Sequence, residues 1–326
     1  MNSYWKDKKV FITGFNGFIG SWLTYELWKQ GAEVTGLLRD QIPNSMIKLM
    51  KLEKKINIVK GDVTDFDILR RSFTEYDIDT VFHLAAQPLV TVAYKDPVST
   101  FKVNIEGTWN ILEVSRLIGI KRLIIASSDK AYGTHNRLPY DETFALKGQF
   151  PYDVSKSCAD LIAQTYFNTY GLPICITRNA NIYGGGDLNF NRIIPETIKC
   201  ILSNKNPIIR SNGKFIREFF FVKDAVKSYL LVAENLHRKD IIGRAFNFGS
   251  SEQIKIIDLV NKIIELSGKT RLKPIILDEV TKEITDQYLS CKLADSLLNW
   301  KPDYTLEEGL KETYNWYKEY FNKTTR

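Results

Sequence analysis

The chain has 326 residues, of which 44% are hydrophobic and 25% are charged, and its formal net charge is +7. This composition is typical of a globular protein with two lobes around a large core, and it excludes long disordered stretches. Lysine and arginine are scattered among acidic residues and no nucleic-acid-binding motif is present, so we expect no nucleic-acid partner. The positive charge indicates either anionic small ligands or a general basic bias of the composition.

Cysteine and histidine are few and form no pattern. The four cysteines show neither CxxC spacing nor pairing, and only three histidines are present. These counts indicate reduced thiols and predict no metal site. The N-terminal residues lead into a strand without an apolar signal region, and no apolar run reaches membrane length. We therefore expect a cytoplasmic protein that does not enter a membrane.

The first half of the chain alternates short apolar runs with amphipathic stretches. Strands are predicted over residues 9–13, 33–37, 56–60, 80–84, 122–127 and 174–178. Helices are predicted over residues 18–30, 66–73, 104–117 and 152–170. Strands that alternate with helices indicate βαβ units, and the first strand is apolar on both faces, as a covered central strand should be. The predicted fold class is α/β, with a Rossmann-type doubly wound parallel sheet.

The second half mixes helices with shorter strands. Helices are predicted over residues 193–202, 223–235, 257–267 and 306–321, and strands over residues 208–210 and 246–248. We interpret residues 1–180 as the Rossmann domain and residues 181–326 as a smaller mixed α/β lobe. Segments at about 215–250 are expected to return to the first domain.

Three glycines follow the first predicted strand. Gly14, Gly17 and Gly20 stand three residues apart, and an amphipathic helix continues from them. Glycines at these places permit a tight turn, a close approach of the backbone to a pyrophosphate, and close packing of the helix on the sheet. The pattern predicts a dinucleotide site, whereas its simplest alternative is a tight turn between a strand and a helix.

Further residues along the predicted sheet edge complete this site. Leu38 occupies the place where an acid would hold the ribose of NAD, while Arg39 would meet the 2′-phosphate of NADP and Asp40 would oppose it. We therefore predict NAD and leave NADP open. Asp62 would accept a hydrogen bond from adenine, and the small residues after His83 leave room for the ribose and diphosphate. The predicted cofactor contacts are Gly14, Asn16, Gly17, Phe18, Ile19, Gly20, Arg39, Asp62, Val63, Leu84, Ala85, Ala86, Tyr152 and Lys156.

A second group of polar residues has catalytic chemistry. Tyr152 and Lys156 stand at i and i+4, on one face of a predicted helix. An adjacent ammonium and a nicotinium charge would favour the phenolate that a base needs at neutral pH. Ser128, Asp129 and Lys130 follow a predicted strand, at the sheet edge where open α/β sheets place their ligands.

The motifs together resemble the extended short-chain dehydrogenase/reductase family of NAD-dependent epimerases and dehydratases. The resemblance rests on Thr13 to Gly20, His83 to Ala86, Ser127-Ser128, Tyr152-x-x-x-Lys156, Arg178-x-x-Asn181-x-Tyr183-Gly184 and the segment from Arg217 to Asp224. It implies that Tyr152 is the catalytic acid/base, that Lys156 holds the nicotinamide ribose and lowers the pKa of the phenol, and that Ser128 orients a sugar hydroxyl.

The residues after the serines bear on the type of reaction. Asp129-Lys130 is similar to the pair in CDP-glucose 4,6-dehydratases, and the chain also resembles GDP-mannose 4,6-dehydratases, whereas 4-epimerases tend to have small apolar residues here. The resemblance implies that an NDP-hexose becomes an NDP-4-keto-6-deoxyhexose. Tyr152 would take the 4-hydroxyl proton, and Asp129 would protonate the departing 6-hydroxyl. A nucleotide-sugar 4-epimerase and a non-catalytic NAD-binding regulator are the alternatives.

The role of Lys130 stays open at this point. To act as a base on carbon 5, its amine would need a pKa roughly three units below the usual value near 10.4. Desolvation beside Lys156 is one way to achieve this. Alternatively Lys130 pairs with Asp129, and then the base is Tyr152, water or Glu142.

Substrate contacts and assembly follow from the same resemblance. The predicted substrate-binding residues are Gln87, Asn181, Arg192 and Arg217, and the amide and guanidinium groups among them suit a diphosphate. Many relatives carry an Arg-x-x-Asp near the C-terminus, but residues 283–288 lack the arginine, so the nucleotide is left open. We expect a homodimer in which the predicted helices 104–117 and 152–170 of each subunit form a four-helix bundle.

Overall fold

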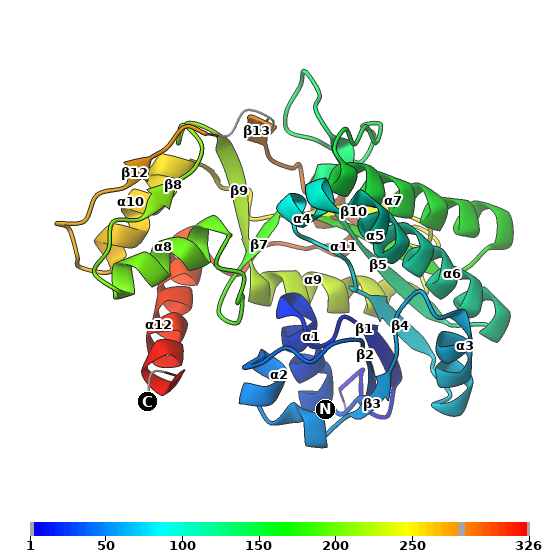
Figure 1. The fold of residues 1–326 in the computed structure, drawn as a ribbon. Coiled ribbons are helices and arrows are strands. Elements are labelled where there is room, and N and C mark those ends of the chain that lie inside the picture. Colours follow the sequence, from blue (N-terminus) through cyan, green and yellow to red (C-terminus); the bar gives the residue numbers. More distant parts are fainter. Residues whose placement is uncertain (1–2, 280–283, 325–326) are drawn as a thin grey trace.

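A parallel sheet of seven strands lies at the centre of the molecule (Figure 1). The computed structural model describes residues 3–279 and 284–324, so Glu283 of the C-terminal segment lies outside the described residues. In spatial order the strands are β10 (Ala245–Phe248), β6 (Ile174–Asn179), β5 (Arg122–Ser128), β4 (Thr80–His83), β1 (Lys9–Thr13), β2 (Glu33–Leu38) and β3 (Asn57–Lys60). The order reverses between β1 and β4, and ligands of such sheets bind outside the carboxyl ends of the strands at this point. The predicted Rossmann-type α/β fold is confirmed.

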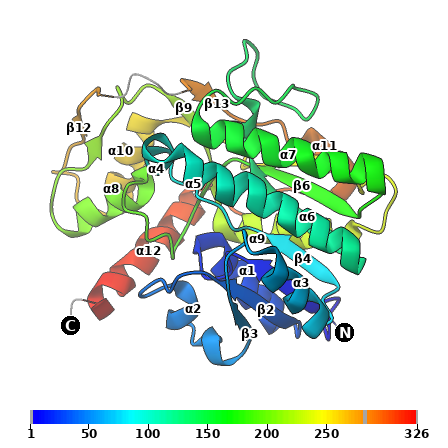
Figure 2. The same ribbon diagram turned by 45° about the vertical axis from the view of Figure 1, so that its right-hand side comes forward.

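Helices cover both faces of this sheet (Figures 1 and 2). One face carries α1 (Phe18–Lys29), α9 (Val222–Asn235) and α11 (Lys292–Leu298), and the other carries α3 (Phe66–Glu75), α6 (Gly107–Ile118) and α7 (Pro151–Tyr170). Successive residues of β1 point to opposite faces. Val10 and Ile12 pack with Leu27 of α1, whereas Phe11 packs on Phe73 of α3, with ring centroids 4.8 Å apart. The apolar run of this strand is therefore explained by burial on both sides.

The approach to α6 is irregular. The short helices α4 (Val90–Lys95) and α5 (Pro97–Phe101) lead into a π-helical turn over Lys102–Glu106. Figure 2 shows α4, α5, α6 and α7 side by side on the outer layer. The π turn contains the buried residue Asn104, and such turns occur frequently at functional sites.

A smaller lobe is built around a second sheet (Figure 1). Its strands are β7 (Asn181–Tyr183), β9 (Ile216–Phe221), β11 (Gln253–Lys255) and β13 (Asp286–Gln287), with β8 (Ile208–Ile209) and β12 (Ile275–Ile276) forming a separate pair. The helices of this lobe are α8 (Ile193–Leu202), α10 (Ile256–Leu266) and α12 (Leu306–Thr324). Ile198, Ile263 and Leu310 from these helices share one apolar core. Between β9 and β11 the chain returns to the large sheet, where α9 packs beside α1 and β10 forms the edge.

The described residues contain neither a membrane-spanning helix nor a cluster of metal-binding side chains. Across residues 3–279 and 284–324, no helix combines the length and apolar character needed to cross a bilayer. Over the same residues, no cluster of three or more His, Cys, Asp or Glu side chains is placed to hold a metal ion.

Candidate active site at the carboxyl edge of the sheet

The turn from β1 to α1 is made by backbone contacts that only glycine permits. Gly14 has a φ of +70°, and a Cβ on it would lie 2.9 Å from the backbone nitrogen of Ala85. A Cβ on Gly20 would lie 2.1 Å from the carbonyl oxygen of Gly14. Gly17 begins α1 without a side-chain cap, so the N–H groups of the first turn are left to other acceptors. This geometry fits a bound diphosphate. The positive end of the α1 dipole lies beside glycines, which have no side chains to block the approach of a phosphate.

The loops after β2 and β3 meet this turn. The Asn16 amide donates to the carbonyl oxygen of Asp40 at 2.8 Å. The Arg39 guanidinium lies 2.6 Å from the Asp40 carboxylate and 3.9 Å from the Asp62 carboxylate. Asp62 also accepts hydrogen bonds from the backbone and hydroxyl of Thr64. The structure thus brings three predicted cofactor contacts together, namely Asn16, Arg39 and Asp62, and it places two carboxylates around the arginine.

The remaining predicted cofactor contacts lie deeper. Val63 is buried against α6, where its carbonyl oxygen accepts a hydrogen bond from Asn110. Phe18 and Ile19 occupy the first turn of α1 and pack on the apolar cores of the two lobes. Leu84, Ala85 and Ala86 follow β4 without a gap.

The floor of the site contains a chain of hydrogen bonds that sequence reasoning missed. The Thr13 hydroxyl oxygen accepts from the backbone N–H groups of Leu84 and Ala85, at 3.1 Å each, and lies 2.8 Å from Nδ1 of His83. Nε2 of His83 lies 3.1 Å from the Thr108 hydroxyl, which donates to the carbonyl oxygen of Asn104. Burial, assisted by the charge of Lys156, lowers the pKa of His83 to about 3. His83 is therefore neutral and structural.

Asn104 joins the helical layer to the loop after β4. Its side-chain oxygen accepts from the backbone N–H of Gln87 at 2.7 Å, and its amide donates to the hydroxyl of Ser155 on α7 at 2.8 Å. The side-chain oxygen of Gln87 in turn accepts from the backbone of Leu89 at 2.7 Å. The side chain of Gln87 therefore stabilises the turn that leads into α4.

Ser128, Tyr152 and Lys156 come together where β5 ends and α7 begins. The Lys156 amine donates to the carbonyl oxygen of Ala126 at 2.8 Å, and burial lowers its pKa to about 8. Burial raises the pKa of Tyr152 to about 12, while the charge of Arg192 and a hydrogen bond from Ser128 act in the opposite direction. The lowered phenol pKa that the resemblance implies is thus not supplied by the protein's own groups.

Asp129 is a buried acid directly beside this tyrosine. It begins the short 3-10 turn Asp129–Tyr132, and only 2% of its surface is exposed. One carboxylate oxygen accepts a hydrogen bond from the Ser128 hydroxyl at 3.0 Å. The other oxygen is buried and has no hydrogen-bond partner among the described residues. A buried carboxylate oxygen without a partner is costly, so it marks a place where a ligand donates a proton or a hydrogen bond.

The structure gives Lys130 a partner that the sequence did not suggest. Its amine donates to the side-chain oxygen of Gln287. Glu142 lies elsewhere, where its carboxylate accepts from the backbone N–H of Asn247 on the edge strand β10 at 2.7 Å. There it lines a cavity of about 860 Å³ at the edge of the sheet.

The predicted substrate-binding residues fall into two kinds. Arg192 begins α8, remains 38% exposed, and pairs with Asp187 at 3.0 Å, and its charge acts on Tyr152. The Asn181 amide donates to the carbonyl oxygen of Glu218 at 3.1 Å. Arg217, by contrast, is buried, and its guanidinium donates to the carbonyl oxygens of Ile216, Ile284 and Thr285.

The glycines before Arg192 allow close packing between the two lobes. A Cβ on Gly185 would lie 2.4 Å from Trp316 of α12, and one on Gly186 would lie 2.4 Å from Met46. The Trp22 indole of α1 also donates to the carbonyl oxygen of Gly185 at 2.7 Å. The contacts with Trp22 and Trp316 therefore position these glycines and the following Asp187, which pairs with Arg192.

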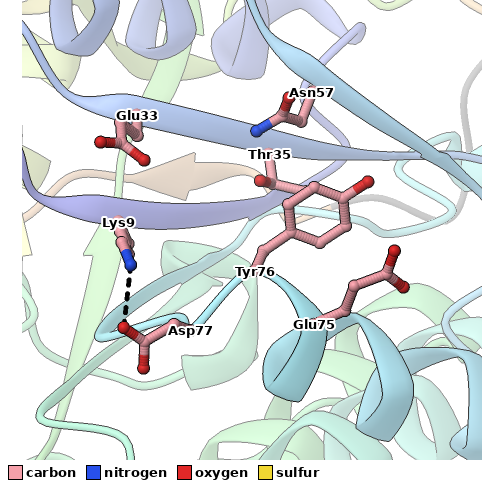
Figure 3. A pocket seen from close by; sticks show the side chains of 7 residues that line it. All are labelled: Lys9, Glu33, Thr35, Asn57, Glu75, Tyr76 and Asp77. Carbon is pink, nitrogen blue, oxygen red and sulfur yellow. Dashed lines mark hydrogen bonds and ion pairs between the residues drawn. The ribbon is translucent and has the colours of Figure 1, made fainter.

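A small cavity at the opposite edge of the large sheet is separate from this site (Figure 3). It has a volume of about 190 Å³ and lies at the amino ends of β1, β2 and β3. Its lining residues are Lys9, Glu33, Thr35, Asn57, Glu75, Tyr76 and Asp77. An exposed ion pair between Lys9 and Asp77 crosses it, and none of the predicted site residues lies there.

Fold and site together define a dinucleotide-binding enzyme of the short-chain dehydrogenase/reductase type. Residues 11–313 match the family model described as GDP-mannose 4,6 dehydratase. The chain belongs to this family of nucleotide-sugar 4,6-dehydratases.

Its relatives include both dehydratases and epimerases. The CDP-glucose 4,6-dehydratase of Salmonella typhimurium is 32% identical over 332 residues, which cover 97% of this chain and 92% of that protein. The structure of dTDP-glucose 4,6-dehydratase from Bacillus anthracis in complex with NAD has a TM-score of 0.85 at 25% identity and covers 96% of this chain and 97% of that one. UDP-glucose 4-epimerase from Thermotoga maritima, solved with UDP-glucose, has a TM-score of 0.87 at 27% identity and covers 97% and 99%. Similarity at this level establishes the family. It does not distinguish dehydration from epimerization, for which the site residues are needed.

Proposed function

We propose that the chain is an NAD-dependent nucleotide-sugar 4,6-dehydratase that converts an NDP-hexose to an NDP-4-keto-6-deoxyhexose. The observation that carries the proposal is the buried carboxylate of Asp129, held by Ser128 on one oxygen and without a described partner on the other. Elimination of the 6-hydroxyl needs an acid at this place. Epimerization at carbon 4 needs none, which makes the epimerase the second candidate.

The cofactor site supports NAD rather than NADP. Arg39 is already paired with Asp40 and has Asp62 nearby, so an added 2′-phosphate would face two carboxylates. The glycine turn and the first turn of α1 would hold the diphosphate, and Lys156 would hold the nicotinamide ribose. The chemistry that NAD would supply here is hydride transfer, which would oxidise carbon 4 of the sugar and later reduce carbon 6.

The side chains handle the protons of this reaction. Tyr152, oriented by Ser128, removes the 4-hydroxyl proton, and the charge of Arg192 and the hydrogen bond from Ser128 favour the phenolate that does so. The new ketone acidifies the proton on carbon 5, which Lys130 removes. As the bond between carbon 6 and its oxygen breaks, Asp129 supplies a proton and water leaves. Lys130 then returns its proton to carbon 5, and the proton held by Tyr152 replaces the one lost from Asp129, so the net change is the loss of one water.

The substrate diphosphate would lie against Arg192 and Asn181. Arg192 is the better candidate of the two predicted arginines, because it remains partly exposed and its charge reaches Tyr152, whereas the donors of Arg217 are engaged by carbonyl oxygens. Gln87, in the loop after β4, is the remaining predicted substrate contact.

A panel of NDP-hexoses tests the proposal. The purified protein is incubated with CDP-, GDP-, UDP- and dTDP-hexoses, and the products are followed by mass spectrometry. We expect one substrate to lose a single water. A product of unchanged mass with inverted carbon 4 would establish the epimerase instead.

Replacement of one acid tests the mechanism. Asp129→Asn should slow dehydration by about 100-fold, the typical size of a general-acid contribution, and should leave cofactor binding intact. Asp295→Asn, an exposed change on α11, is the matched control. Equal activity in the Asp129 and Asp295 variants would remove Asp129 from the mechanism.

The surface of the helical layer supports a homodimer. Val98 of α5, Trp109 of α6 and Leu161 of α7 are 63%, 44% and 51% exposed, and Tyr94 of α4 is 44% exposed. An apolar surface of this extent on adjacent helices fits a second copy of the chain, whose α6 and α7 would complete a four-helix bundle. Leu161→Glu should shift the protein from dimer to monomer in light scattering. A native chain that is already monomeric at micromolar concentration would contradict the dimer.

A further inference from the structure

We propose that Gln287 is a positioning residue for Lys130 and that it fixes the catalytic turn against the smaller lobe. This inference rests on the proposed dehydratase function, because it assigns Lys130 a task in the elimination. It also addresses the segment after residue 283, where the C-terminal sequence pattern of the relatives is not followed.

One amide side chain contacts both neighbouring residues of the turn. The Gln287 amide nitrogen donates to the carbonyl oxygen of Asp129 at 2.9 Å, and its oxygen accepts from the Lys130 amine. Gln287 is completely buried. A buried amide is tolerated when both of its ends are satisfied, and here both partners lie in the candidate active site.

The strand that carries Gln287 is itself held firmly. β13 pairs with β9, with Gln287 opposite Arg217. The Arg217 guanidinium donates to the carbonyl oxygen of Thr285 at 2.7 Å, and the backbone N–H of Ile216 donates to the Asp286 carboxylate at 3.0 Å. Just beyond, the backbone N–H of Leu289 donates to the buried carboxylate of Glu218 at 2.8 Å. Contacts from β9 therefore fix the backbone on both sides of Gln287.

A neutral acceptor suits the task given to Lys130. The lysine side chain is a flexible chain of four carbons, so its amine needs a fixed hydrogen-bond partner to stay in one orientation. A carboxylate in that place would favour the charged ammonium, whereas an amide oxygen orients the amine without adding a negative charge. Gln287 acts only through Lys130 and Asp129, so its loss should affect the elimination and spare the oxidation at carbon 4 by Tyr152.

Gln287→Leu is the principal test, with Gln253→Leu as its control. Gln253 is exposed on β11, in the same small sheet. In Gln287→Leu we expect kcat to fall by at least about tenfold while KM changes little, because a misplacement of about 1 Å costs up to a hundredfold in rate. The near-ultraviolet absorbance of reduced nicotinamide should build up during turnover, and a deuterium label on carbon 5 of the substrate should be retained longer.

Gln287→Glu separates orientation from folding. This variant is nearly isosteric and keeps an acceptor for Lys130, but its carboxylate should raise the pKa of that amine and move the rising limb of the kcat profile to higher pH. The thermal midpoint and cofactor affinity of each variant show whether it folds. If Gln287→Leu is unfolded, Gln287→Glu decides alone.

Three results would overturn the inference. They are a kcat in Gln287→Leu equal to that of Gln253→Leu, an equal loss of oxidation and elimination, and an unshifted pH profile in a folded Gln287→Glu. If the native protein releases no water from any NDP-hexose, the proposed function fails separately. The contact is then tested by acylation of Lys130, read by peptide mass spectrometry, which should be faster in Gln287→Leu than in the native chain, and an equal rate would refute it.

Discussion

The two halves of the site are built in different ways. Within the cofactor half, the turn from β1 to α1 is made by a local segment, in which Gly20 allows α1 to approach the carbonyl of Gly14 and Gly14 allows the turn to approach the loop after β4. The catalytic half is made by side chains from distant segments, since Asp129 is hydrogen-bonded to a glutamine 158 residues later. The comparison teaches that the first half is a property of the fold, whereas the second specifies the reaction. Each of the following changes tests one side of this division.

The largest effect is expected on the catalytic side. Tyr152→Phe should reduce kcat by about a thousandfold, because it removes the acid/base group and little packing. The thermal midpoint should be unchanged. Tyr170→Phe, an exposed change at the other end of α7, is the control and should have native activity. A Tyr152→Phe protein with more than a tenth of native kcat would contradict the role of the phenol.

A buried acid beside the catalytic turn predicts a pH dependence of stability. Burial raises the pKa of Glu218 from 4.5 to about 7. The folded protein therefore holds this proton more tightly than the unfolded chain does, and the resulting stabilisation, present below pH 4.5, is lost as the pH rises to 7. The expected contribution to the free energy of unfolding is about 3 kcal/mol.

Urea denaturation of the native chain and of Glu218→Gln at pH 5 and pH 8 measures this contribution. The substitution should destabilise the protein more at pH 5 than at pH 8, since only the native chain gains from the raised pKa. A difference between native and variant that is the same at both pH values would show that Glu218 titrates normally.

A smaller effect is expected on the cofactor side. Gly20→Ala should lower NAD affinity by about ten- to a hundredfold, because the added methyl group must displace the carbonyl of Gly14, and overpacking costs about 1–3 kcal/mol. Gly268→Ala is the control, since a Cβ there meets open space, although its φ of +71° costs some stability. Titration calorimetry compares the two, and native affinity in Gly20→Ala would show that the turn is not the diphosphate site.

The smallest effect is expected at the rim. Arg39→Ala should change NAD affinity by less than about threefold, because an exposed ion pair contributes little. Preference for NAD over NADP should also stay the same. A clear loss of NADP binding in this variant would mean that Arg39 leaves Asp40 to meet the 2′-phosphate.

The same division explains what sequence could predict. The βαβ pattern, the glycine turn and the Tyr152–Lys156 pair depend on residues close together in the chain, and each is typical of its structure without further information. The bounds of the long elements were predicted to within about three residues for this reason, as in the strand over residues 9–13 and the helix over residues 193–202. The fold class was therefore fully predictable.

Residues whose roles depend on distant partners were not predictable. Gln287 contacts the catalytic turn because a two-residue strand pairs with β9, and strands this short have no sequence period. Arg217 could be recognised as a residue needing a buried partner, but the partners are carbonyl oxygens 67 and 68 positions away, which no side-chain pattern reveals. Asn104 was passed over because it lies within an otherwise ordinary amphipathic helix, and only its π turn sets it apart.

The chain of hydrogen bonds under the site has one more consequence. The Thr108 hydroxyl donates its hydrogen to the carbonyl oxygen of Asn104, so it can only accept from Nε2 of His83. Nδ1 of the neutral imidazole therefore accepts a hydrogen bond from the Thr13 hydroxyl. With a pKa of about 3, the imidazole keeps this arrangement at every pH at which the enzyme would work. This chain of hydrogen bonds therefore does not carry a proton away from the site, and the proton taken from the sugar does not leave through it. In the proposed reaction, the proton that Tyr152 takes from the 4-hydroxyl must therefore leave on the substrate side, where it replaces the one that Asp129 gives to the departing water.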